Sequence, residues 1–246
     1  MIIGSRLFFL KNLPSTNTYT ASLLRNTELP EGAVIYTNYQ TSGRGQAGNT
    51  WESEENKNLL LSIILLPSMI NPADQFLISM AVSLGIIDFL RKYISALSIK
   101  WPNDIYVKND KIAGILIENS ILGDLIEHSI AGIGININQE KFLSNAPNPV
   151  SLSILTGRQY DLAVCLHQLA IELDKRYKQL ISEDFAAIRH DYLSLLYRHN
   201  EWGEFRDMNG KFKGRISNVT DTGRLQVERA DGIINDYAFK EIDLVL

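Results

Sequence analysis

The chain has 246 residues, of which 45% are hydrophobic and 21% are charged, and its formal net charge is −4. This balance is typical of a globular protein and argues against a largely disordered chain, while the acidic net charge disfavours a protein that coats nucleic acid. The one cysteine, Cys165, excludes an internal disulfide framework and a cysteine-only zinc site.

The first part of the chain mixes strands and helices. Strands are indicated by Val, Ile and Tyr enrichment or by continuous apolar runs, and helices by apolar residues three or four apart. In chain order, these patterns predict a strand at 6–10, a helix with Ser15 or Thr16 as its N-cap, a strand at 33–39, a strand buried on both faces at 58–66 and a long helix at 71–93.

The middle of the chain predicts a hairpin, a further strand and two helices. Extended segments at 98–101 and 105–107 precede the turn residues Asn109-Asp110. The pattern then predicts a returning strand at 112–118, a strand within 125–138, and helices at about 161–181 and 183–197.

The composition changes after Trp202, where only short strands and turns follow. This pattern predicts a small all-β barrel, which at this length would be marginal alone and is expected to dock on the main domain. We therefore predict two units, residues 1–200 and 201–246.

No membrane segment and no secretory signal are predicted. The longest apolar stretch identified from the sequence, residues 59–67, is shorter than the ~20 residues that a membrane span needs. The N-terminus has no cationic segment before its apolar residues. A reducing cytoplasm is the expected compartment.

Several common catalytic motifs are absent from the sequence. It contains no GxxxxGK[ST] loop, no HExxH and no CxxC. The four histidines show no metal-ligand spacing, and Cys165 lies among apolar neighbours in a predicted helix. We interpret these residues as packing or surface groups rather than ligands or nucleophiles.

Five other segments combine residue types that suit a ligand site. Each also has a plainer interpretation: a helix cap, a flexible connection, a turn, a solvated lysine and sheet-packing glycines, respectively. In chain order they are Ser15-Thr16-Asn17, residues 40–46 with Trp51 beyond, residues 100–104, residues 111–118 and residues 132–136.

The glycines of these segments give the reason to consider a ligand. Gly43 and Gly45 flank Arg44, so that the backbone can approach a ligand closely while the guanidinium binds a carboxylate or phosphate. Gly132 and Gly134 remove side chains from one face of a strand, which suits a flat ligand lying on the sheet.

In order and spacing, the five segments resemble the biotin–protein ligase family. The resemblance runs from about Ser15 to Asn138, and the C-terminal β segment is similar to that family's SH3-like barrel. It implies an α+β fold: a mixed β-sheet backed by helices, like class II aminoacyl-tRNA synthetases and biotin ligases, followed by the small barrel. It also implies ATP-dependent biotinylation of one lysine on a biotin carboxyl carrier protein, through biotinyl-5′-AMP.

The resemblance assigns roles residue by residue. Arg44, Lys111 and Asp104 would be catalytic, and Asp104 would also be a ligand of Mg²⁺. ATP contacts are implied for Asn103, Asp104, Gly134 and Asn136. Contacts with biotin or biotinyl-AMP are implied for Ser15, Thr16, Asn17, Gln40, Gly43, Arg44, Gly45, Gln46, Trp51, Lys111 and Gly114.

Gln46 departs from the family pattern, in which arginine commonly stands two residues after the position of Arg44. A neutral amide can donate a hydrogen bond but supplies no charge. Retention of the intermediate by this loop is therefore in question, and residues outside the loop are candidates to compensate.

Three other functions are weighed against this one. A lipoate–protein ligase would use the same acyl-adenylate logic, a silent biotin-binding regulatory module would not need Arg44, Asp104 and Lys111 together, and a structural adaptor would leave the five segments unexplained. Some family members carry an N-terminal helix-turn-helix, but here the catalytic region starts almost at Met1, so we expect no DNA binding. A homodimer is compatible with the resemblance.

Overall fold

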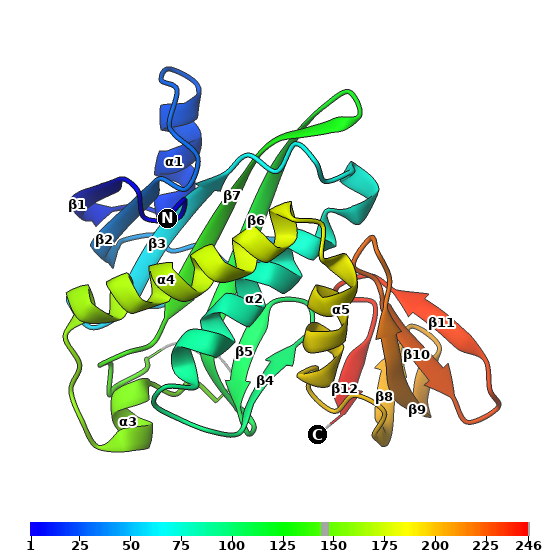
Figure 1. Cartoon of the computed structure of the whole chain (residues 1–246). Coiled ribbons are helices and arrows are strands. Elements are labelled where there is room, and N and C mark those ends of the chain that lie inside the picture. Colours follow the sequence, from blue (N-terminus) through cyan, green and yellow to red (C-terminus); the bar gives the residue numbers. More distant parts are fainter. Residues whose placement is uncertain (144–147, 246) are drawn as a thin grey trace.

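The computed structural model describes residues 1–143 and 148–245. Its larger sheet has seven strands in the order β1-β2-β3-β7-β6-β5-β4, with β1 and β2 parallel and the other neighbours antiparallel (Figure 1). The strands are β1 (Leu7–Leu13), β2 (Val34–Gln40), β3 (Leu59–Leu65), β4 (Leu97–Lys100), β5 (Asp104–Val107), β6 (Asp110–Leu122) and β7 (Leu125–Ile135).

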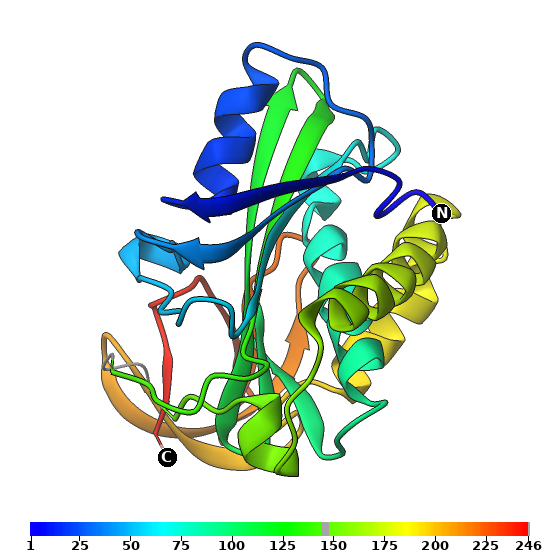
Figure 2. The same ribbon diagram turned by 90° about the vertical axis from the view of Figure 1, so that its left-hand side faces the viewer.

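The two faces of this sheet are covered differently. One face carries α2 (Phe76–Leu90), α4 (Leu162–Ile181) and α5 (Phe185–Ser194), whereas α1 (Thr16–Leu24) lies on the other face (Figure 2). A short helix, α3 (Leu152–Thr156), and two 3₁₀ turns, η1 (Gln46–Gly48) and η2 (Pro72–Asp74), complete the helical elements of the described residues. The α1 face is therefore the one left open for a ligand.

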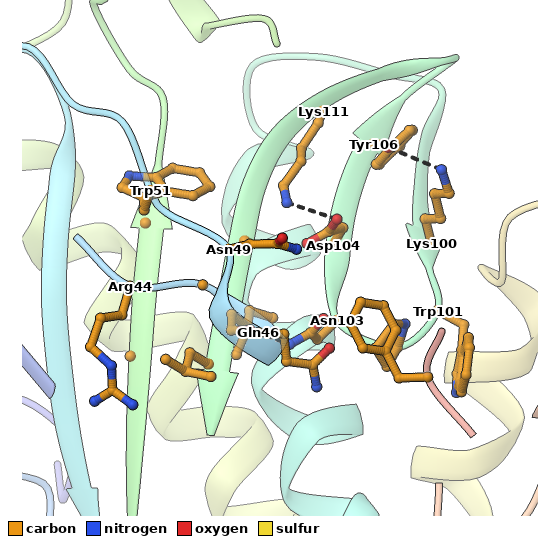
Figure 3. Close-up of a pocket in the computed structure, with 18 of the residues that line it drawn as sticks. Arg44, Gln46, Asn49, Trp51, Lys100, Trp101, Asn103, Asp104, Tyr106 and Lys111 are labelled. Carbon is orange, nitrogen blue, oxygen red and sulfur yellow. Dashed lines mark hydrogen bonds and ion pairs between the residues drawn. The ribbon is translucent and has the colours of Figure 1, made fainter. Parts of the chain in front are cut away.

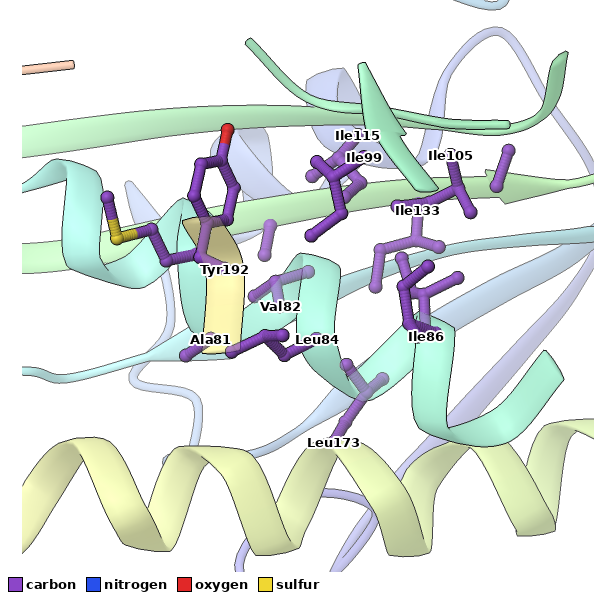
Figure 4. Close-up of a cluster of buried hydrophobic side chains, with 14 of the residues drawn as sticks. Ala81, Val82, Leu84, Ile86, Ile99, Ile105, Ile115, Ile133, Leu173 and Tyr192 are labelled. Carbon is purple, nitrogen blue, oxygen red and sulfur yellow. The ribbon is translucent and has the colours of Figure 1, made fainter. Parts of the chain in front are cut away.

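The core lies between the sheet and α2. All seven residues of β3 are buried, as the nearly continuous apolar run predicted. Figure 4 shows isoleucines of four strands packing onto α2, with Leu173 of α4 on the helix's far side. Gly85 of α2 directly contacts Leu173, so the absent side chain lets the two helices approach closely.

Helix α2 is apolar almost all round, since it is covered by the sheet and by two helices. The segment Pro72–Leu90 is long and apolar enough to cross a membrane by composition, but 72% of it is buried inside the molecule. It is a core helix. The sequence predicted this helix but gave residues 59–67 as the longest apolar stretch, because two serines, one glycine and one aspartate interrupt the apolar residues of 76–90.

The second sheet begins at Trp202 and is antiparallel throughout, with the strand order β11-β10-β9-β8-β12. Its apolar side buries Phe205, Ile216 and Val227. The strands are β8 (Trp202–Asp207), β9 (Gly210–Val219), β10 (Leu225–Arg229), β11 (Ile234–Tyr237) and β12 (Asp243–Val245). This agrees with the predicted small β unit, and its status as a separate domain stays a prediction.

Three local predictions need correction. The long helix ends at Leu90 rather than Tyr93, the last helix is limited to Phe185–Ser194, and α3 was not predicted. Ser15 occupies the N-cap position of α1 but makes no capping side-chain bond. Instead, the Gln40 side chain accepts a hydrogen bond from the backbone N–H of Thr16, so tertiary contact replaces the local cap.

Candidate active site

A cavity of about 370 Å³ opens on the α1 face of the large sheet and reaches the second sheet. It collects residues that are far apart in the sequence, from the start of α1, the 41–50 loop, the β5–β6 hairpin and β7. Of the fifteen residues predicted for the site, thirteen line it: Ser15, Thr16, Asn17, Gln40, Arg44, Gly45, Gln46, Trp51, Asn103, Asp104, Lys111, Gly114 and Gly134.

The other two predicted residues lie outside the lining. Gly43 is buried against the backbone of Trp51, where a side chain would collide with the Trp51 carbonyl, so it shapes the loop. Asn136 is 3% exposed, donates to the carbonyl of Val150, and leaves its own Oδ1 without a partner among the described residues. A ligand role for these two stays a prediction.

One end of the cavity offers polar groups held by short contacts. Thr16 donates to Oε1 of Gln40 from its backbone N–H at 2.8 Å and from its hydroxyl at 3.2 Å. Because the Gln40 carbonyl is occupied, the group that remains for a ligand is the Nε2 donor. This end suits a compact ligand with a carbonyl or ureido edge.

The glycines of β6 and β7 accommodate side chains of this protein rather than an empty platform. Gly114 pairs with Gly134 across the two strands, and a Cβ on either would collide with the indole of Trp51. A Cβ on Gly132 would collide with the Asn17 amide. The prediction of a flat ligand on bare sheet is therefore corrected, because the flat group over Gly114 and Gly134 is the Trp51 ring.

Asn17 is buried and fully engaged. Its Nδ2 donates to the carbonyl of Leu116 at 3.1 Å and to Glu118 at 2.9 Å, while its Oδ1 accepts from Ser62 at 2.6 Å. An amide with these three bonds has little capacity left for a ligand. Its predicted contact with biotin is untested, but its contacts here are within the protein.

The opposite end of the cavity is charged. Lys111 on β6 and Asp104 on β5 form an ion pair of 2.7 Å, and the Lys111 ammonium lies 5.7 Å from the Trp51 ring (Figure 3). Lys100 lies on β4 opposite Asp104 and donates to the Tyr106 hydroxyl at 3.2 Å. Two cations and a carboxylate therefore converge where an anionic ligand would be stabilised.

Burial lowers the pKa of Lys100 from its ordinary value. The positive charge of Lys111 lowers it further, while the carboxylates of Asp104 and Asp243 oppose the shift. Burial also raises the pKa of the Tyr106 hydroxyl, which keeps that group protonated. Lys100 lay within a segment selected from the sequence, but its role was missed because a lone lysine at a strand end is usually solvated.

Asn103 has a structural partner as well. It is 7% exposed, its side-chain Nδ2 donates to the backbone carbonyl of Ile115, and its backbone carbonyl accepts from the backbone N–H of Ile115. These bonds fix the point where the β5–β6 pairing begins and where Asp104 is held beside Lys111. The predicted ATP contact of Asn103 is a separate, untested role.

The second sheet contributes a wall that the sequence did not predict. The side chains of Phe239, Lys240 and Asp243 line the cavity. Trp101, between β4 and β5, donates from its indole to the carbonyl of Gly223 at 2.9 Å and contacts Phe239 edge-on. No local pattern could have identified Phe239, Lys240 and Asp243, because only the docking of the second sheet brings them to the site.

Arg44 points away from the Lys111–Asp104 pair (Figure 3). Its guanidinium binds both carboxylate oxygens of Glu118, at 2.8 and 3.4 Å, and lies 3.4 Å from the Thr18 hydroxyl. Glu118 was not among the predicted site residues. Its only sequence signal is a charge closing an otherwise apolar strand.

A model of the biotin/lipoate A/B protein ligase family matches residues 9–136. The bifunctional ligase/repressor BirA of Bacillus subtilis is 31% identical to the chain, over 96% of this chain and 74% of its own length. The biotin–[acetyl-CoA-carboxylase] ligase of Paracoccus denitrificans is 29% identical, over 88% of this chain and 91% of its own.

The fold is similar to that of solved structures. The biotin protein ligase of Aquifex aeolicus in complex with biotin and ATP superposes with a TM-score of 0.77. The match covers 98% of this chain and 99% of the other, at 24% identity. The similarity includes the second sheet as well as the first.

Proposed function

The chain belongs to the biotin/lipoate A/B protein ligase family, and we propose that it is an ATP-dependent biotin–protein ligase. It activates biotin with ATP to give biotinyl-5′-AMP and pyrophosphate, and then transfers the biotinyl group to a lysine ε-amine. The observation that supports this most directly is the cavity, which has neutral hydrogen-bonding groups at one end and Lys111, Asp104 and Lys100 at the other.

In this proposal, Gln40 and Thr16 hold the ureido end of biotin. Lys111 stabilises the carboxylate of biotin and the α-phosphate as their negative charges come together, because adenylation otherwise brings two anions into contact. Asp104 is held within 2.7 Å of Lys111 and orients that ammonium. Trp51 walls the cavity over Gly114 and Gly134 and keeps water from the mixed anhydride.

Asp104 is the residue that would hold Mg²⁺. The described residues contain no cluster of three or more potential metal ligands, so the protein itself offers no complete cage. A single carboxylate is nevertheless compatible with magnesium, which commonly binds one or two carboxylates together with substrate phosphates. Bound with ATP, the ion would neutralise phosphate charge.

The acceptor in this proposal is a biotin carboxyl carrier protein, consistent with the name of the Paracoccus relative. Biotin carriers and ATP meet in the cytoplasm, which is therefore the proposed location. The approaching lysine enters from the open side of the cavity, where Asp104 can accept its proton.

The test is incubation of the protein with biotin, Mg·ATP and a biotin carboxyl carrier domain, followed by mass spectrometry of the carrier. We expect one biotinyl group on one lysine, and none on a carrier whose target lysine is changed to arginine. Lipoate in place of biotin is the matched control. Transfer of lipoate without transfer of biotin would replace this proposal by lipoate–protein ligase activity, and no transfer of either would refute a ligase.

A further inference from the structure

One side chain of the 41–50 loop connects the loop to the rest of the protein by hydrogen bonds. Among its described side chains, only Arg44 hydrogen-bonds outside the loop, and its main partner is Glu118. The loop's own geometry comes from backbone bonds, such as Trp51 N–H to the Gly43 carbonyl at 2.9 Å. The first two residues of the loop are held by backbone hydrogen bonds from the N–H groups of Thr41 and Ser42 to the carbonyls of Leu13 and Pro14. Beyond Ser42, the side-chain hydrogen bonds of the described loop residues to the rest of the protein run through Arg44, so the position of this part over the cavity depends on what holds Glu118.

Glu118 is held by buried groups. On β6 it follows Gly114 and Leu116 on the same face of the strand, so it continues the cavity wall toward α1. Its Oε2 accepts from Asn17, which is 3% exposed and is itself bound to Ser62 and to the Leu116 carbonyl. Gly132 leaves the space that Asn17 occupies.

We propose that Glu118 is a positioning residue that clamps the 41–50 loop closed over the cavity through its two-point contact with Arg44. The contacts form a series: Gly132 makes room for Asn17, Asn17 donates to Glu118, and Glu118 binds Arg44. Both charged side chains are part-exposed, 47% for Arg44 and 36% for Glu118, so the clamp is weak enough to open for ligand exchange. Its consequence for biotinyl-AMP rests on the proposed function, whereas its consequence for loop opening does not.

Loop opening is tested by limited proteolysis of the native protein. Arg44 is the only trypsin target between Lys11 and Lys57 apart from Arg25, and cleavage after it gives a distinct fragment by mass spectrometry. When the loop opens and closes faster than trypsin cleaves, the cleavage rate is proportional to the fraction of molecules whose loop is open. Glu118→Ala should raise cleavage after Arg44 by about threefold, within the range of exposed ion pairs. Glu118→Gln, which retains one carbonyl acceptor, should fall between Ala and wild type.

Glu127→Ala is the matched control, because it removes the same charge from an exposed position on the neighbouring strand β7. Its cleavage after Arg44 should equal that of wild type. Equal cleavage in Glu118→Ala and wild type would overturn the clamp, as would an equal rise in the control. This readout needs no biotin and stands even if the enzyme has another substrate.

The second test measures release of biotinyl-AMP. Glu118→Ala should accelerate release by about threefold, and it should add nothing in a protein that already carries Arg44→Ala, because the clamp then has no partner. Independent, multiplying effects of the two substitutions would overturn the proposal. Faster adenylation or slower release in Glu118→Ala would also overturn it, since Glu118 would then hold Arg44 away from the ligand.

Discussion

At the scale of single residues, three polar side chains of the site are each oriented by a defined partner. Gln40 is oriented by Thr16, Lys111 by Asp104, and Lys100 by Tyr106. This ion pair and these two hydrogen bonds preorganise a charged site, since the groups need not reorganise when negative charge develops on the substrate. Two predictions follow from the two lysines.

Lys111→Ala should lower the rate of biotinyl-adenylate formation at least about tenfold, a barrier change of roughly 1.4 kcal/mol, because the reacting anions lose their nearest cation. Single-turnover release of pyrophosphate measures this step. Lys11→Ala removes an exposed lysine from β1 and should have no effect. A near-normal rate in Lys111→Ala would remove this residue from the site.

The lowered pKa of Lys100 predicts that the rate of adenylation falls at alkaline pH. Because burial lowers its pKa, the ammonium loses its proton, and its charge at the site, at a pH below that of an ordinary lysine. Asp104, Lys111 and Asp243 are the charged groups that modulate this shift. Lys100→Arg should move this fall to higher pH, since a guanidinium stays protonated. A fall that does not move belongs to another group.

The same shift has a consequence for stability. A lysine whose pKa is lower in the folded than in the unfolded state opposes folding while it is protonated. That penalty is fully present below the folded pKa and disappears as the pH rises toward the unfolded value. While it is protonated, Lys100 therefore lowers the stability of the folded protein.

At the scale of elements, the paired strands β6 and β7 form the floor of the cavity, and their glycines decide what lies on it. Gly114 and Gly134 pair directly and together admit the Trp51 ring. A pair of glycines on adjacent strands weakens a sheet, because neither residue has a side chain to pack. The indole of Trp51 therefore also supplies packing at this point of the sheet.

Gly134→Ala should displace Trp51, because the added Cβ has no room beneath the indole. Overpacking of this kind costs about 1–3 kcal/mol of unfolding free energy, and adenylation should slow as the wall shifts. Chemical denaturation measures the cost. It should shrink in a Trp51→Ala background, and an unchanged cost there would show that the ring is not the obstacle. Gly203→Ala, where a Cβ has ordinary contact distance, is the control.

At the scale of the whole molecule, the second sheet is part of the site. Trp101 bonds to the Gly223 carbonyl, and Arg189 of α5 forms ion pairs with both Asp74 and Asp221. The Trp101 bond holds the turn between β9 and β10 against the β4–β5 connection that precedes Asp104, and the Arg189–Asp221 pair holds the same turn against α5. The cavity wall at Phe239 and Asp243 depends on that docking.

Trp101→Phe should loosen this docking while keeping an aromatic ring against Phe239. Loss of the indole hydrogen bond costs about 0.5–1.5 kcal/mol. We expect faster hydrogen exchange in residues 224–245 and a higher KM for ATP. Trp202→Phe, which changes an exposed tryptophan of the same sheet, should alter neither. Unchanged exchange in Trp101→Phe would show that this bond does not hold the two sheets together.

Local patterns alone determined most of the elements and the chemistry of the site. The nearly continuous apolar run predicted β3, and the turn residues predicted the β5–β6 hairpin. These elements were predictable because burial and turn geometry act between residues that are close in the chain. The expectation of a biotin-ligase-like enzyme came instead from the resemblance of the five segments, taken together, to a known family. Thirteen of the fifteen predicted residues then proved to line one cavity.

Tertiary structure alone decided the partners of those residues. Gln40 replaces a local cap on α1, Trp51 occupies the glycine floor, Glu118 holds Arg44, and the second sheet closes one wall. Each contact joins segments tens of residues apart, and its free energy depends on shape and distance that no local pattern contains. The sequence thus indicated which groups would gather at one site, and folding determined which of them line the cavity and which hold the others in place.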